Sequence, residues 1–137
     1  MSRNKSARRQ GQAVIEGALV TLTLAAVLIG ILDLGQVLFI HQTFVSRARS
    51  AVRHGVVNAC DESAIRNMVL YGQPTAGPTT VFGLTAGMVS VARTDVGTNE
   101  QRIVVTISGY PYHFFSPWIG GVFTGRSIVA SLPLETF

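Results

Sequence analysis

Few side chains in this chain are of types that could do chemistry, and their spacing limits what that chemistry could be. The histidines are His41, His54 and His113, and the single cysteine is Cys60. On a helix, His41 and His54 would lie about 20 Å apart, too far to share a metal ion within one chain. Cys60 lacks the companions of a zinc site and of a nucleophile–base pair. The sequence therefore predicts no metal, no cofactor and no enzyme.

Cys60 still allows two interpretations. The first is a small, half-buried residue near a helix end. The second is an intersubunit disulfide outside the cytoplasm, since a lone cysteine cannot form a disulfide within its own chain.

Glu16 is unusual because it lies inside an apolar stretch, residues 13–40, where a charge is costly at membrane depth. Five residues earlier, Gly11 ends a basic leader, residues 1–11, that carries Arg3, Lys5, Arg8 and Arg9 and that we expect to be disordered. We interpret this arrangement as a processing site, with cleavage after Gly11 and a new ammonium group on Gln12. Glu16 would be the counter-charge for that amine or for a neighbouring subunit's amine, and such a pair would set the axial register between subunits. The alternative is a glutamate placed by the helix dipole in an uncleaved signal anchor.

Asp33 is the second carboxylate of the apolar stretch, about 25 Å along a helix from Glu16. Two interpretations remain open for it. It is either an interfacial aspartate with access to water or a contact with a partner helix during assembly.

Composition and charge indicate a membrane segment rather than a nucleic-acid-binding surface. The 137 residues are 47% hydrophobic and 13% charged, with a mean hydropathy of +0.38. The net charge of +4 arises from the leader, because acidic and basic residues cancel in the rest of the chain. Basic residues beside a membrane helix stay on the cytoplasmic side, so we predict a single-pass protein with its N-terminus in the cytoplasm.

A single long helix is predicted over residues 12–58, with its membrane span at residues 13–40. Beyond the span, apolar residues recur at three- and four-residue steps, which is typical of an amphipathic helix. Ala51, Gly55 and Ala59 form a row of small residues that would let another element approach closely. We therefore predict that this row packs against a partner.

The rest of the chain, residues 59–137, predicts a small exported α+β domain. Asp61 begins a short helix, Ala64–Tyr71, which Gly72 ends, and a loop covers residues 72–87. The strand candidates are Met88–Thr94, Arg102–Tyr110 and Ser127–Glu135, with the first two joined in a hairpin by Val96–Glu100. In the second candidate, alternation places Ile103, Val105 and Ile107 on one face. The predicted fold is one long helix packed on an antiparallel sheet of about three strands, with a short second helix.

A long aromatic loop is predicted over residues 111–126. Aromatic residues in and beside it would cap the small core or lie at the membrane interface, or else form a docking surface for another subunit. They are Tyr110, Tyr112, Phe114, Phe115, Trp118 and Phe123.

The N-terminal half of the chain resembles the TadE-like proteins, which are minor pilins (pseudopilins) of the tight-adherence pilus. The resemblance covers about residues 8–56, where a basic leader, the motif G-Q-A-x-x-E and an apolar stretch follow one another. It extends more weakly to Tyr110-Pro111 and a final strand. The residues that match by position are Gly11, Gln12, Ala13, Glu16, Asp33, Gly35, Arg49 and Gly55.

The resemblance implies a structural subunit of the bacterial cytoplasmic (inner) membrane. A prepilin peptidase of the aspartyl type would remove the leader on the cytoplasmic side. The mature subunit would contact membrane lipid and other pilin and pseudopilin subunits, help initiate or assemble the filament, and in part be incorporated in the extracellular pilus. An uncleaved signal-anchored envelope protein whose exported domain binds a partner is the alternative, and a main filament subunit is a third.

Overall fold

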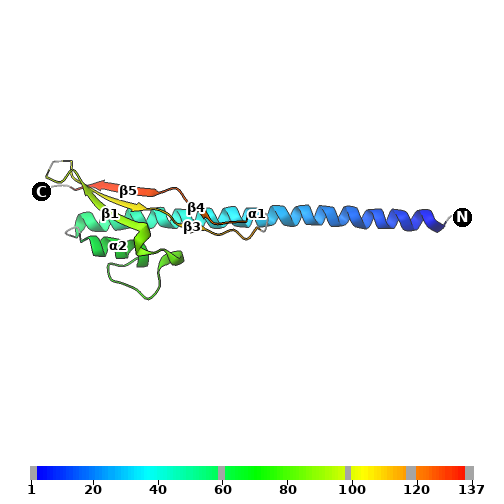
Figure 1. Ribbon diagram of the computed structural model, residues 1–137, viewed down its shortest axis with the longest axis horizontal. Helices are drawn as coiled ribbons and strands as arrows, with labels where there is room; N and C mark the ends of the chain where they lie inside the picture. The colour runs from blue at the N-terminus through cyan, green and yellow to red at the C-terminus, as the bar shows by residue number, and fades with distance from the viewer. Residues whose placement is uncertain (1–2, 59–60, 98–99, 117–119, 135–137) are drawn as a thin grey trace. The chain divides into compact units, whose positions relative to one another are not determined.

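The computed structural model describes residues 3–58, 61–97, 100–116 and 120–134, with only the backbone for residues 3–10. Its elements confirm the predicted α+β class: one long N-terminal helix packs on a three-stranded antiparallel sheet, together with a short second helix (Figure 1). The chain divides into two compact units. The first, here called the helical unit, comprises Met1–Gln36 and Phe114–Gly120. The second, the sheet unit, comprises Val37–His113 and Gly121–Phe137.

The long helix α1 spans Arg3–Val57, so it begins earlier than predicted and includes most of the leader. A disordered leader was expected, and that expectation is wrong. The leader residues Lys5, Ala7 and Arg8 are good helix formers, and a single interior glycine such as Gly11 costs only about 1 kcal/mol relative to alanine. Residues 3–10 therefore continue the helix outward from the apolar stretch.

Within the helical unit, most apolar side chains of α1 are exposed: residues 11–25 are exposed on every face, whereas Ala26 and Ile29 are half-buried. Those exposed by more than half include Val14, Ile15, Leu19, Val20, Leu22, Ile31, Leu32 and Leu34. Among the described residues, the segment Gly11–Val57 is long and apolar enough to cross a membrane, with a mean hydropathy of 2.3 over its most apolar window. Side chains exposed on every face of a helix are expected where the surroundings are themselves apolar.

The sheet of the sheet unit has the order β1-β2-β5, formed by Val89–Thr94, Arg102–Ile107 and Ile128–Pro133. Both pairings are antiparallel, with Val91 opposite Val105 and Val105 opposite Ala130. The predicted hairpin between the first two strands is confirmed, although residues 98–99 of its turn lie outside the described residues. The predicted end of the second strand at Tyr110 was too late, because β2 ends at Ile107. Strand β5 ends at Pro133, and Glu135 lies outside the described residues.

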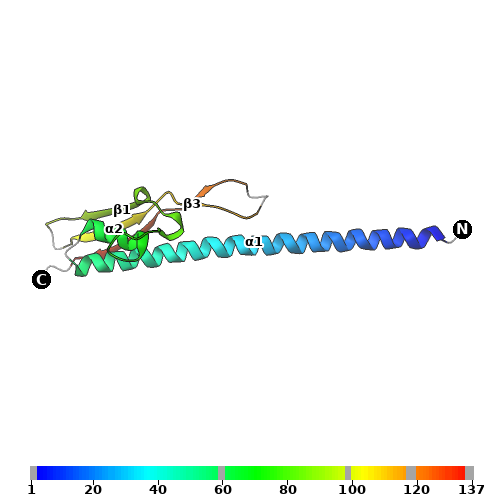
Figure 2. The same ribbon diagram turned by 90° about the horizontal axis from the view of Figure 1, so that it is seen from below.

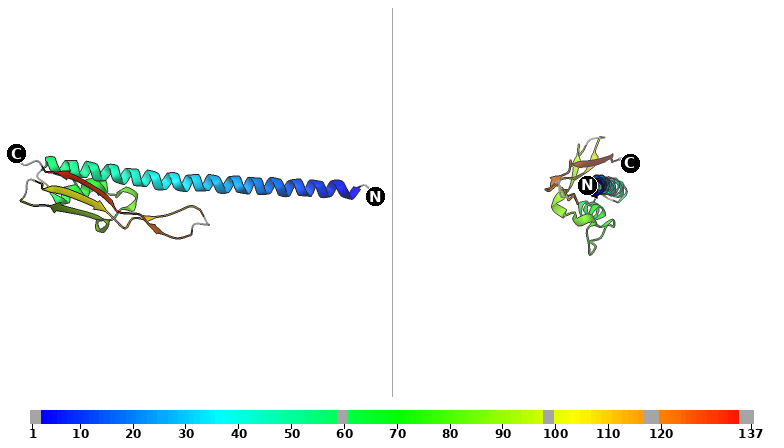
Figure 3. Two further views of the ribbon diagram at one scale, coloured as in Figure 1. Left: turned by 90° about the horizontal axis from the view of Figure 1, so that it is seen from above. Right: turned by 90° about the vertical axis from the view of Figure 1, so that its right-hand side faces the viewer.

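Alternation along β2 makes it the central strand of the core. Ile103, Val105 and Ile107 are buried, as the period of two predicted, and they face the helices. The C-terminal part of α1 and the helix α2, Glu62–Tyr71, form one layer, and the sheet forms the other (Figures 2 and 3). This arrangement buries one stripe of α1, which contains Phe44, Ala48, Ala51 and Val52.

Both ends of α2 are closed as the sequence predicted. The Asp61 carboxylate accepts hydrogen bonds from the backbone N–H and the hydroxyl of Ser63, at 2.9 and 2.8 Å. These hydrogen bonds lower the pKa of Asp61 below its usual value. At the other end Gly72 adopts a left-handed conformation, with φ of 78°, and its N–H bonds to the carbonyl of Met68. Asp61 and Gly72 therefore cap helix α2 and set where it begins and ends.

Aromatic rings close one end of the core in the sheet unit. The ring of Phe44, which is fully buried, packs edge-on against Tyr110 with the ring centres 4.7 Å apart, and Tyr110 packs in turn on Tyr112. The Tyr110 hydroxyl donates a hydrogen bond of 2.9 Å to the carbonyl of Phe82. Burial raises the pKa of Tyr110, and burial together with the nearby Tyr110 raises the pKa of Tyr112. These two tyrosines thus cap the core, which was the first of the interpretations offered for the aromatic residues.

Several short elements were missed in the sequence. The aromatic loop contains a hairpin of two-residue strands, β3 (Pro111–Tyr112) and β4 (Phe123–Thr124), and the loop after α2 contains two 3₁₀ turns, η1 (Val81–Gly83) and η2 (Ala86–Met88). Gly125 follows the hairpin, and a Cβ atom there would overlap the ring of Tyr112. Strands of two residues are too short to show an alternating pattern, so only the fold reveals them.

Candidate functional site

The predicted processing site lies on the exposed surface of α1. Gly11, Gln12 and Glu16 are all exposed, and Gln12 and Glu16 are one helical turn apart. An added Cβ atom at Gly11 would meet nothing within 4 Å, so no packing in this fold requires a glycine there. Since glycine also weakens a helix, its presence at Gly11 has no explanation within the subunit.

The helical state of this site has a consequence for any peptidase. A protease needs an extended segment, and α1 would have to open locally before cleavage after Gly11. Glycine lowers the free energy needed for that opening, because it gains more backbone freedom than any other residue. Gly11 is thus exposed, and as a glycine it lowers the cost of opening α1 there by about 1 kcal/mol relative to alanine.

Asp33 is buried within its own chain, and its contact with a partner helix stays a prediction. Its side chain is only 2% exposed, so the expected carboxylate with water access is wrong. Its contacts are with its own chain: Oδ1 accepts a 2.7 Å hydrogen bond from the N–H of Phe115, and Oδ2 accepts a 3.0 Å hydrogen bond from the N–H of Ser116. We call this arrangement the Asp33 clasp. It joins residues 82 and 83 positions apart within the helical unit.

The row of small residues packs inside the subunit. Ala51 and Gly55 are buried, and a Cβ atom on Gly55 would lie 2.5 Å from Cδ1 of Ile65 and 3.1 Å from Cδ1 of Ile103. The elements that Gly55 allows to approach are therefore α2 and β2 of the same chain, and the prediction of packing against a partner is corrected for Ala51 and Gly55. Ala59 and Cys60 lie outside the described residues.

Replacing Gly55 by alanine is expected to destabilise the sheet unit by about 1–3 kcal/mol, because the added methyl group would overfill the contact with Ile65. Denaturant unfolding of the full-length protein in detergent micelles, followed by near-UV circular dichroism, measures this change. Gly35→Ala on the same helix is the matched control, because a Cβ atom there meets nothing within 4 Å. Equal loss of stability in both variants would contradict the packing role of Gly55.

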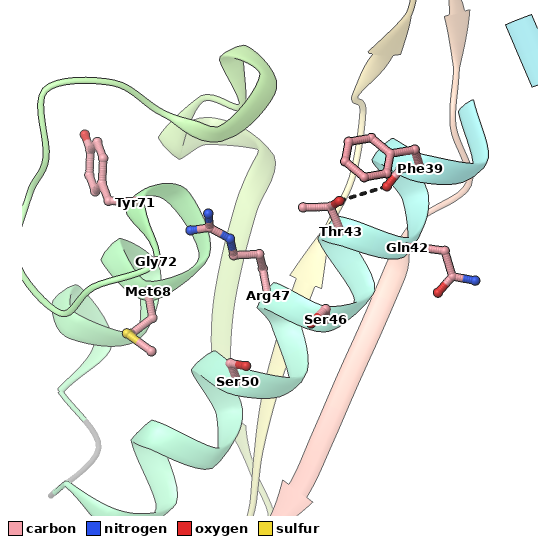
Figure 4. A pocket seen from close by; sticks show the side chains of 9 residues that line it. All are labelled: Phe39, Gln42, Thr43, Ser46, Arg47, Ser50, Met68, Tyr71 and Gly72. Atoms are coloured by element: carbon pink, nitrogen blue, oxygen red, sulfur yellow. Dashed lines mark hydrogen bonds between the residues drawn. The ribbon is translucent and has the colours of Figure 1, made fainter. Parts of the chain in front are cut away.

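A groove of about 680 Å³ lies between α1 and the end of α2, and sequence reasoning did not find it. Figure 4 shows the Arg47 side chain directed from α1 toward the turn at Gly72, with Thr43 bonded to the carbonyl of Phe39 on the same helix. A Cβ atom at Gly72 would overlap the Arg47 guanidinium group. Two separate features therefore favour glycine at position 72: the positive φ and the close approach of the Arg47 side chain.

Arg47 has a structural explanation in this position. A cation at the C-terminal end of a helix is favoured by the helix dipole, and Arg47 lies against the end of α2. Among the described residues its buried Nη1 has no hydrogen-bond partner. We interpret the groove as a consequence of the packing of the Arg47 side chain against the end of α2.

The fold does not bring together the other side chains that could bind a metal or take part in a reaction. Among the described residues, His, Cys, Asp and Glu form no group of three or more that could hold a metal ion. The aromatic residues of the predicted loop are divided between two environments. Tyr110 and Tyr112 are buried in the sheet unit, whereas Phe115 is 74% exposed in the helical unit. Trp118 lies outside the described residues.

Compared with protein-family models, with curated proteins and with solved structures, the chain has no significant match in any of the three.

Proposed function

We propose that this chain is a pilin-like, single-pass membrane protein whose exported α+β domain follows a long apolar helix. The observation that carries this proposal is the uncovered apolar surface of α1 between Gly11 and the sheet unit, with the glutamate Glu16 at its N-terminal end. Apolar side chains on all faces of a helix need an apolar partner, which a bilayer supplies before assembly and neighbouring helices supply in a filament.

More particularly, we propose a TadE-like minor pilin of a tight-adherence pilus. In this role a prepilin peptidase cleaves after Gly11, and the subunit then helps initiate or assemble the filament. The ammonium group of Gln12 and the carboxylate of Glu16 form a charge pair, within a subunit or between two. Because an unmatched charge in an apolar setting costs several kcal/mol, this pair favours one axial register over others.

Intact mass tests the proposal directly. The protein is isolated from membranes and from sheared surface material of cells that contain their native peptidase. A species that begins at Gln12 in both fractions supports maturation and entry into the filament. A species that still begins near Met1, present only in membranes, would overturn the proposal.

One observation favours a second candidate function. Helix α1 passes through Gly11 without a break, as it would in an uncleaved signal anchor. In that case the protein is an envelope protein whose exported domain binds a partner, and the leader is retained. The same mass measurement separates the two candidates.

Replacing Glu16 by alanine is expected to leave cleavage intact and to reduce assembly strongly, because the ammonium group of Gln12 loses its counter-charge. The measurement is the amount of mature protein in sheared filaments relative to membranes. Glu16→Gln is the matched variant, since it keeps the size and removes the charge, and it should assemble as poorly as Glu16→Ala. Assembly at the normal level in Glu16→Gln would remove the role of charge in setting the register.

A further inference from the structure

The Asp33 clasp holds a non-helical segment against the apolar helix. Asp33 lies within the stretch 13–40, about 10 Å along α1 before Ile40, where this stretch ends. Phe115 and Ser116 lie 82 and 83 residues later in the sequence, and both of their N–H groups donate to the same carboxylate. The clasp therefore joins two segments at a depth where α1 is still apolar.

Both partners of the clasp would be costly alone in a bilayer. An ionised aspartate inside a membrane segment is expensive, and so is each backbone N–H that lacks an acceptor in hydrocarbon. In the clasp each oxygen of Asp33 satisfies one N–H, at 2.7 and 3.0 Å. Irregular backbone is tolerated at membrane depth only where its polar groups are satisfied in this way.

The surroundings of the clasp are apolar and uncovered. Phe115 is 74% exposed, and on α1 the neighbouring Leu32 and Leu34 are exposed by 65% and 64%. The sequence from residue 110 to residue 120 contains no Lys, Arg, Asp or Glu. Ser116, by contrast, is buried beside Asp33. Polar groups thus face inward at the clasp and aromatic and aliphatic groups face outward, which is the pattern of a surface that contacts lipid.

We propose that the segment Phe114–Ser116 inserts into the outer leaflet beside α1, with Asp33 as its internal acceptor and Phe115 in contact with lipid. The partner is the boundary between headgroups and acyl chains. This inference rests on one part of the proposed function, that α1 spans a membrane, and does not require cleavage after Gly11. Phenylalanine is among the apolar side chains that interfacial segments bury at the boundary between headgroups and acyl chains.

The single tryptophan of the chain provides a reporter, because Trp118 follows Ser116 by two residues in the sequence. The full-length protein is reconstituted in phosphatidylcholine vesicles, and Trp118 fluorescence is quenched either by lipid brominated near the top of an acyl chain or by aqueous iodide. We expect quenching by the brominated lipid and protection from iodide. The reverse pattern would overturn the inference.

Variants of Asp33 test whether the clasp is responsible. Asp33→Asn retains one acceptor and Asp33→Leu retains none, while leucine keeps α1 fully compatible with the bilayer. Quenching by brominated lipid should fall from wild type to Asp33→Asn and be lost in Asp33→Leu, with a gain in quenching by iodide. Asp61→Asn in the sheet unit is the matched control and should behave as the wild type, because asparagine also caps a helix. Unchanged quenching in Asp33→Leu would overturn the role of the clasp.

Dilution in lipid and flotation with vesicles separate contact with lipid from contact with a second subunit and from failure to insert. Protection of Trp118 that disappears as the protein is diluted in lipid would mean that a second subunit covers the segment, which overturns the lipid contact. Failure of the protein to float with vesicles would overturn both this inference and the proposed function. Lipid quenching in a protein that keeps its leader in native cells would support the inference while overturning maturation.

Discussion

Replacing Gly11 with leucine is expected to leave the leader attached and to abolish assembly. The reason is not the fold, because a side chain at Gly11 would meet nothing within 4 Å. Under the proposed function the reason is the peptidase, whose site would have to accept the backbone at this position, together with the loss of a glycine that lowers the cost of unwinding α1 there. Intact mass of the membrane protein measures the outcome, with the unprocessed species starting near Met1.

Gly30→Leu is the matched control for this experiment. Gly30 lies on the same helix, and a Cβ atom there would also meet nothing within 4 Å. The control should be processed normally. Normal processing of Gly11→Leu would contradict the interpretation of Gly11 as the cleavage site.

Replacing Phe44 by alanine is expected to cost about 3–5 kcal/mol of the free energy of unfolding of the sheet unit. Phe44 is fully buried and lies between the rings of Tyr110 and Phe82, so its removal leaves a cavity with few ways to collapse. Domains of this size are stable by only about 5–15 kcal/mol, so a large part of the stability is lost. Denaturant unfolding in detergent micelles measures the change.

Phe39→Ala on the same helix is the comparison. Phe39 is 64% exposed and has one edge-on contact with Phe82, so its removal should cost about 1 kcal/mol, close to the value of an aromatic pair. Similar losses in the two variants would contradict the central position of Phe44 in the core.

The sequence predicted those parts of the fold that depend on local patterns. The period of two in β2 placed Ile103, Val105 and Ile107 on the buried face, and Asp61 and Gly72 marked the two ends of α2. Each of these signals lies within a few residues of the structure that it specifies. The long helix was predicted for the same reason, apart from its start at Arg3.

Contacts between distant segments were not predictable in this way. Nothing near Asp33 in the sequence indicates that its acceptors would be used by Phe115 and Ser116. The fit of Gly55 against Ile65 likewise depends on how α2 packs, although the small residue itself indicated a close approach. Residues at the processing site are a third case, because the roles of Gly11 and Glu16 depend on molecules other than this chain and stay predictions.

The continuity of α1 through Gly11 means that proteolysis there would turn the middle of a helix into its beginning. In a regular α-helix the N–H groups of residues 12–15 bond to the carbonyls of residues 8–11, all of which leave with the leader. Three backbone N–H groups, those of residues 13–15, and the new ammonium group of Gln12 would then lie uncovered at the edge of the bilayer, at the positive end of the helix dipole. The carboxylate of Glu16 can neutralise the new charge or accept from some of these N–H groups, but not from all of them. Loss of the leader would thus raise the free energy of the isolated subunit in lipid, because its uncovered N–H groups would lack acceptors. Acceptors on a neighbouring subunit would lower that free energy, so that maturation itself would supply a driving force for polymerisation.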